Sequence, residues 1–141
     1  MEFEFETKGL KELGDELKGF TEKVRLRSLN TATRFATKPA AEEAKRIAPE
    51  RSGNVKSAIV LRKRTPRSKY RSTFVVTIKS KGAFGSTWYA RLVEFGTVKQ
   101  PAQPFMRVAF ERHKEQFPIR FGNKLRLVID AFNKKINKAI P

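Results

Sequence analysis

The sequence contains no cysteine, which excludes disulfides, thiol catalysis and cysteine-based zinc or iron–sulfur sites. Its single histidine, His113, lies in an Arg-His-Lys stretch, where a lone histidine is most often a surface or boundary residue. The acids are scattered, so neighbouring positions supply no cluster of convergent metal ligands. We therefore expect no metal and no cofactor.

Long apolar runs are also missing. No stretch of about 18 apolar residues occurs, and the acidic, alternating start MEFEFETKGLKEL differs from a secretory signal. We expect a protein that is made and kept in solution, with no membrane partner. The serines show no nucleophile-elbow pattern, and the segment Gly82-Ala-Phe-Gly85 lacks the lysine of a phosphate-binding loop. Hydrolase and nucleotide-binding functions are therefore not expected.

Acidic side chains are scarce beyond the first 20 residues. Residues 1–20 carry six acids against three lysines, whereas the segment Arg51–Val93 has eleven basic residues and no acid, within a chain of net charge +17. Such a field attracts polyanions or an acidic protein surface without specifying a designed site. The densest basic cluster is a candidate contact for DNA or an acidic partner, although a solvated loop explains it equally well. It comprises Arg62, Lys63, Arg64, Arg67, Lys69 and Arg71, with Tyr70 available for stacking.

The first third of the chain has the patterns of a short strand and a long helix. Residues Glu2–Glu6 alternate phenylalanine with glutamate, which predicts a half-buried strand. Leucines spaced by three and four between residues 10 and 17 predict a short helix. From Thr21 to Ala48 small apolar residues recur at helical spacing, Thr21 suits the N-cap, and the following Pro49 predicts the end. Pro39 lies inside this pattern and predicts a kink or a split.

The middle of the chain is rich in β-branched and aromatic residues. These predict strands at Val55–Leu61 and Thr73–Ile78, joined by the basic segment Arg62–Ser72 as an exposed connection or hairpin arm. A third strand is predicted at about Thr87–Phe95, because apolar residues occupy both odd and even positions there, as in a strand that is covered on both faces.

The last third predicts helices. Pro104 suits the first position of a helix that continues to Phe117, Pro118 should interrupt it, and a further helical extension follows at about 119–140. Together these patterns predict an α+β fold in which a small antiparallel sheet packs against a long kinked N-terminal helix and a C-terminal helix. At 141 residues we expect a single domain over 1–141, with a basic hairpin arm at about 62–72.

Glu94 is the only acid between Arg51 and Arg107, and it lies within an apolar run. A functional carboxylate is one interpretation. Because an unpaired buried charge is costly, the favoured interpretation is a structural pair with an arginine.

Three segments together resemble one family. They are Ala44-Lys-Arg-Ile-Ala-Pro49 followed by Ser52-Gly-Asn-Val-Lys-Ser-Ala-Ile59, then Trp88-Tyr-Ala-Arg-Leu-Val-Glu-Phe-Gly-Thr97, and then Pro101-Ala-Gln-Pro-Phe-Met-Arg107. In this order they are similar to the minor tail component or tail-completion proteins of long-tailed bacteriophages, over roughly residues 8–117. Ser52 stands where threonine is usual. The scaffold motif comprises Trp88, Tyr89, Glu94, Phe95, Gly96, Pro104 and Phe105.

The resemblance implies a non-enzymatic virion protein, made in the bacterial cytoplasm, that forms a ring at the head-proximal end of the tail. It also implies six-fold stoichiometry and contact with a tail terminator, tail tube or head connector. From the charge map we add the hypothesis that Glu2, Glu4 and Glu6 of one subunit meet the basic surface of the next. Basic residues facing the channel would then lie along packaged double-stranded DNA without sequence preference.

Two other functions remain open from the residues alone. A non-specific DNA-binding protein would use the basic segment 62–71 and bind duplex as a monomer with a steep salt dependence. A small basic ribonuclease would use arginines, lysines and His113 to stabilise a phosphoryl transition state.

Overall fold

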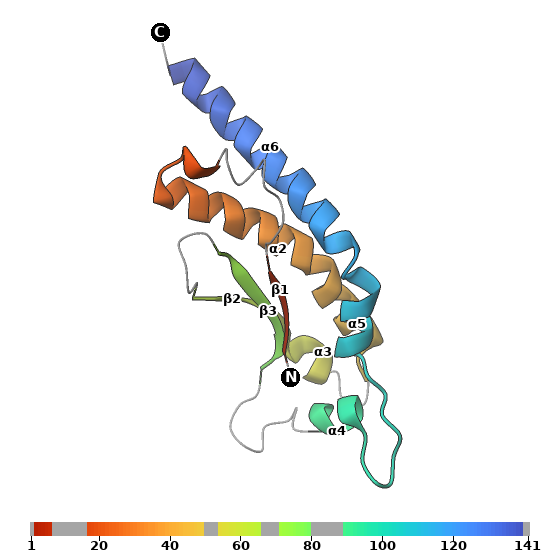
Figure 1. The fold of residues 1–141 in the computed structure, drawn as a ribbon. Coiled ribbons are helices and arrows are strands. Elements are labelled where there is room, and N and C mark those ends of the chain that lie inside the picture. The colour runs from red at the N-terminus through yellow and green to blue at the C-terminus, as the bar shows by residue number, and fades with distance from the viewer. Residues whose placement is uncertain (1, 7–16, 50–53, 66–70, 80–88, 140–141) are drawn as a thin grey trace.

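The computed structural model describes residues 2–6, 17–49, 54–65, 71–79 and 89–139. In chain order the elements are β1 (Glu2–Glu6), α2 (Glu22–Ile47), α3 (Asn54–Ala58), β2 (Ile59–Arg64), β3 (Thr73–Ile78), α4 (Ala90–Phe95), α5 (Met106–His113) and α6 (Gln116–Ala139). The fold is therefore α+β, as predicted. Long helices α2 and α6 lie side by side above the small sheet, and α4 lies at the opposite end of the molecule from the C-terminus (Figure 1).

Helix α2 begins and ends where the sequence predicts. The Val24 N–H donates to Thr21 Oγ1 at 3.4 Å as an N-cap bond, and Ala48 leaves the helix in an extended conformation before Pro49. The helix is not split at Pro39. Proline removes the bond to the carbonyl of Phe35, and the exposure of Phe35 puts the missing bond on a side of the helix that water reaches.

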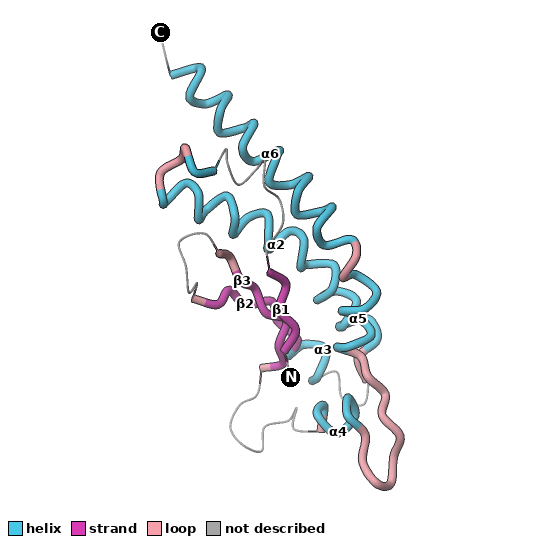
Figure 2. The backbone as a smooth tube through the Cα atoms, in the orientation of Figure 1, coloured by secondary structure: helices cyan, strands magenta, loops and turns pink. Residues whose placement is uncertain are grey.

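The sheet has the strand order β1-β3-β2, with both pairs antiparallel, so β1 and β2 are its two edges (Figure 2). The predicted strands Glu2–Glu6 and Thr73–Ile78 are confirmed. The strand predicted at Val55–Leu61 was wrong in its first half, where α3 forms. Strand β2 instead runs to Arg64, because it pairs with β3 along its whole length, so the predicted basic arm starts inside the sheet.

The first apolar cluster lies between α2 and α6. Alanines 32, 36 and 40 of α2 form a smooth surface, on which α6 buries Phe117, Phe121, Leu125 and Ile129. The threonines at 33 and 37 are also buried, and their hydroxyls donate to the carbonyls of Leu29 and Thr33 at 2.7 and 2.8 Å, so they leave no unpaired donor. Leu17 joins this cluster, whereas the rest of the short helix predicted around residues 10–17 lies outside the described residues.

The second cluster lies between the other half of α2, the sheet and α5. Ala41 and Ala44 of α2, Ile59 of β2, Val76 of β3 and Met106 of α5 are among its buried members. Helices α2 and α5 thus cover the same face of the sheet. Since α2 belongs to both clusters and contacts α6, α5 and the sheet, it joins the two clusters.

The break between the last two helices falls at Lys114 and Glu115, just before the predicted interruption at Pro118. Pro118 is the third residue of α6, and it is tolerated there because the first amides of a helix have no intrahelical partner. The C-terminal extension is helical to Ala139, and its first half belongs to the core.

The third strand predicted at Thr87–Phe95 was wrong over its described part, which forms helix α4. Ala90, Val93 and Glu94 are the more buried positions, and Leu92 and Phe95 are exposed. This is the i, i+3, i+4 spacing of a helix with one covered face. It accounts for the apolar residues at both odd and even positions that had suggested a strand.

Candidate functional site

Glu94 ties the end of α4 to the start of α5. Its side chain is only 3% exposed. Carboxylate Oε2 accepts hydrogen bonds from the backbone N–H groups of Phe105 and Met106 at 2.8 and 3.0 Å, and Oε1 accepts one from Arg107 at 3.0 Å. These amides belong to the first turn of α5, where donors lack intrahelical partners and the helix dipole favours an anion. We call this arrangement, Glu94 with the amides of residues 105–107, the clasp.

The clasp replaces the arginine partner expected for Glu94. Three backbone amides satisfy the carboxylate instead, and this accounts for a buried acid in an apolar segment. With both carboxylate oxygens bonded to the helix start, Glu94 has a structural role, which was the favoured interpretation, with amides in place of the guanidinium.

The loop between α4 and α5 is held at several further points. Gly96 donates its N–H to the Leu92 carbonyl at 2.8 Å, and the Gln103 N–H donates to the Val93 carbonyl at 2.8 Å. Gly96 has φ 76°, and a Cβ at this position would lie 2.7 Å from the Ala102 nitrogen. Only glycine combines this conformation with such a close approach of backbone.

Apolar side chains are displayed on this fixed loop and the adjoining helix. Leu92 is 44% exposed, Phe95 is 64% exposed and Val98 is fully exposed. We call these three residues the apolar tip. Figure 2 shows the loop extending away from the sheet and the long helices. Among the described residues that adjoin the tip in the chain, Arg91 and Lys99 are exposed cations, as is Arg107 at the clasp, whereas the acid Glu94 is buried.

The other scaffold-motif residues divide into core and surroundings. Phe105 is fully buried in the second cluster, and Tyr89 packs against that cluster. Pro104 precedes the clasp and is half-buried, one residue before the N-cap of α5 rather than at its first position. Trp88 lies outside the described residues. Among the described motif residues, Glu94, Gly96, Pro104 and Phe105 thus lie in the clasp or in the loop that it closes.

The structure brings together three of the six basic candidates. Arg62, Lys63 and Arg64 are exposed on edge strand β2, where with Val75 and Thr77 they line a hollow of about 240 Å³. Arg71 is half-buried just before β3, and Arg67 and Lys69 lie outside the described residues. A hollow lined by three cations suits an anionic group such as a phosphate or a carboxylate.

The acidic candidates lie in the same sheet as these cations. Strand β1, which contains Glu2, Glu4 and Glu6, forms one edge, and β2 forms the other. The register aligns Glu4 with Val75 of β3 and Val75 with Arg62 of β2. One sheet therefore has an acidic edge strand and a basic edge strand.

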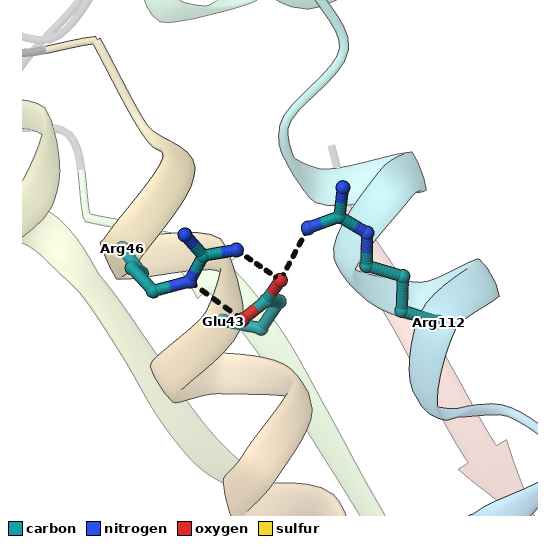
Figure 3. Close-up of polar contacts among 3 residues, drawn as sticks. All are labelled: Glu43, Arg46 and Arg112. Atoms are coloured by element: carbon teal, nitrogen blue, oxygen red, sulfur yellow. Dashed lines mark hydrogen bonds and ion pairs between the residues drawn. The ribbon is translucent and has the colours of Figure 1, made fainter.

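Glu43 of α2 accepts hydrogen bonds from two arginines, Arg46 of the same helix and Arg112 of α5, and the second of these links the two helices (Figure 3). Arg46 donates from Nε and Nη2 to the two carboxylate oxygens at 2.9 and 2.7 Å, and Arg112 of α5 donates from Nη1 to Oε1 at 2.5 Å. Hydrogen bonds from Arg46, and then from Arg112, lower the pKa of Glu43 from 4.5 to about 2. No sequence pattern singled out Glu43, because its partner in α5 lies 69 residues away.

Replacing Glu43 should make stability less dependent on pH. Glu43→Gln should lower the free energy of unfolding at pH 7 by about 1 kcal/mol, since both arginines are largely exposed. A depressed pKa contributes stability above the ordinary value, and this contribution is lost as pH falls from about 4.5 to about 2. Urea unfolding across this range should show the two proteins converging. A difference that stays constant down to pH 2, or one equalled by the neighbouring Glu42→Gln, would contradict the assignment.

His113 is half-buried, and its Nδ1 lies 3.3 Å from Nη1 of Arg120. No group of three or more potential metal ligands occurs among the described residues. Nor, within the same residues, does any helix have the length and hydropathy needed to cross a membrane.

Comparison with known proteins identifies the class to which this scaffold belongs. Residues 11–96 match the family described as "Bacteriophage HK97-gp10, putative tail-component". The match covers more than half of the chain, so this protein belongs to that family of phage tail components. No curated protein and no solved structure matches the chain. The matched range ends at Gly96, but Glu94 bonds it directly to residues 105–107, so the third motif completes the same structural unit.

Membership in this family gives the general role of the protein. The protein is a structural tail component of a bacteriophage, its place is the virion, and its partners include other tail proteins.

Proposed function

We propose that this protein forms a ring at the head-proximal end of the tail, where it helps to complete the tail or to join it to the head. The observation that carries the proposal is the apolar tip. The clasp, Gly96 and the Gln103–Val93 hydrogen bond fix the end of α4 and the loop that follows it. Phe95 and Val98 are therefore held in position although both side chains are exposed to water. Scattered surface apolar residues are ordinary, but three on one fixed projection are typical of a protein–protein contact.

The exposed charges around the tip indicate the chemistry of its partner. Arg91, Lys99 and Arg107 favour an acidic surface, and a chain of net charge +17 repels copies of its own basic face. Tail terminator, tail tube and head connector proteins are the neighbours that the proposed position offers. The six-fold stoichiometry rests on the resemblance stated above, and contact of the channel surface with packaged DNA rests on the charge alone.

Electron microscopy of particles assembled without this protein tests the position. Separate full heads and finished tails would support the joining role, whereas particles that lack tails would contradict it.

Polar substitutions at the tip should block assembly without unfolding the subunit. Phe95→Ser with Val98→Ser should reduce complementation of a phage lacking the protein at least tenfold, because both side chains already face water in the free subunit. The matched control is Ile119→Ser with Leu127→Ser, which removes exposed apolar side chains of α6. Equal phage yields from the two double variants would contradict a specific role for the tip.

A second candidate function is non-specific DNA binding, and the hollow lined by Arg62, Lys63 and Arg64 is the observation that favours it. Gel-shift titration of the purified monomer against duplex DNA discriminates between the two functions. Tight binding by the monomer that weakens steeply with salt would favour the DNA-binding function over the assembly role.

A further inference from the structure

We propose that neighbouring subunits join edge to edge, with strand β1 of one copy pairing with strand β2 of the next, so that their sheets become continuous. This inference rests on the proposed ring and names the surface that closes it. Both strands are edges of the described sheet, and each has one side whose backbone groups no described strand pairs. Such an edge is a template for another strand.

The phase of the hydrogen-bond ladder shows which residues offer these groups. The Lys79 N–H donates to the Ala58 carbonyl at 2.8 Å, which extends the β2–β3 register by one pair. Because backbone direction alternates along a strand, Val60, Arg62 and Arg64 point their N–H and C=O groups toward β3. Ile59, Leu61 and Lys63 therefore point theirs outward.

The same alternation continues across β3 to the other edge. Residues 73, 75 and 77 of β3 face β2, so Phe74 and Val76 face β1, where the register pairs them with Phe5 and Phe3. The backbone groups of Glu2, Glu4 and Glu6 then point outward. Three residues of β1 and three residues of β2 therefore offer outward backbone groups to a neighbouring strand.

Charge selects the partner for each edge. Strand β1 contains three glutamates, and β2 ends in Arg62, Lys63 and Arg64. Cations on an edge strand oppose pairing with a neutral or basic strand. Pairing with an acidic strand relieves that repulsion, so the β2 edge fits β1 of a second copy better than another β2 edge.

Strand direction is compatible with a closed ring. Both β1 and β2 run antiparallel to β3, so they are parallel to each other. A rotation about an axis that lies roughly along the strands keeps their direction, so it places β1 of the next copy beside β2 in the parallel orientation. The contact joins two different surfaces, as a head-to-tail ring requires.

A proline substitution tests the backbone contact. Lys63→Pro removes an outward N–H, while every β2–β3 ladder bond keeps its donor. It should raise the concentration needed for assembly at least tenfold in sedimentation velocity, whereas Lys63→Gln, which loses only the charge, should raise it less. Both should show the urea midpoint of the parent. Assembly of Lys63→Pro equal to that of Lys63→Gln would overturn the proposal.

A pair of charge-swap variants tests whether the strand that pairs with β2 is β1 of a second copy. This test does not require the proline variant to fold. Variant A carries Arg62→Glu and Lys63→Glu, and variant B carries Glu4→Lys and Glu6→Lys. Each alone should fail to assemble, because like charges would meet at every contact, and an equimolar mixture should assemble. A mixture as inactive as its components would overturn the pairing of β1 with β2. Absence of rings from the parent protein at any concentration would overturn the proposed ring itself, so the two failures are distinguishable.

Discussion

Glu94→Ala should lower the free energy of unfolding by about 3–5 kcal/mol, the largest effect expected of a single polar substitution in this protein. The change removes the acceptor for three backbone amides at the start of α5 and leaves a space in a site that is 3% exposed. Hydrogen bonds to a charged group contribute more than neutral ones, and buried donors without partners are costly. Urea unfolding followed by circular dichroism measures the loss.

Glu94→Gln is the matched control for this prediction. Glutamine keeps the size of the side chain and one acceptor oxygen, but it brings an NH₂ group toward amides that are themselves donors. Its cost should therefore be roughly half that of alanine. Alanine and glutamine variants as stable as the parent would show that the clasp contributes nothing to the fold.

Gly96→Ala should lower the free energy of unfolding by about 2–4 kcal/mol, from strain in a glycine-only conformation and from overpacking. The φ of 76° is strained for any residue with a Cβ, and the new methyl group would lie 2.7 Å from the nitrogen and 3.0 Å from the Cα of Ala102. Both contacts are with backbone, so no rotation of a side chain relieves them. The same urea titration measures the change.

Ala102→Gly tests how much of this cost comes from the methyl group of Ala102 rather than from its backbone. In the double variant the 3.2 Å contact with the Ala102 Cβ disappears, while the backbone contacts and the positive φ remain. Only a small part of the stability should return. Full recovery would mean that the methyl of Ala102, rather than its backbone, is what requires glycine at position 96.

Elements with a single clear period were predictable from the sequence. The alternation in Glu2–Glu6 and the cap at Thr21 identified β1 and the start of α2, because neighbouring residues determine both. The prediction was wrong for α4, where apolar residues at both parities suggested a strand buried on both faces. In a helix of six residues, the spacing of Ala90, Val93 and Glu94 is the informative signal, and it occupies barely more than one turn.

The candidate site was predictable only in part. Glu94, Gly96 and Phe105 were identified as members of one scaffold, but their contact depends on how the loop reverses the chain, which spacing does not specify. The apolar tip was missed because two of its residues, Leu92 and Phe95, were assigned to a buried strand, and no pattern singled out Val98. The split into acidic and basic edge strands required the sheet order, since β1 and β2 are far apart in the sequence and never touch within the sheet.

Helix α2 contributes to both apolar clusters, and Glu43 fastens it to α5, whose first turn holds the clasp. A force applied to the projecting loop would therefore pass through α5 into α2, the longest of the described helices, and from there into α6. A neighbour that engages the tip would therefore act on both long helices as well as on the loop itself.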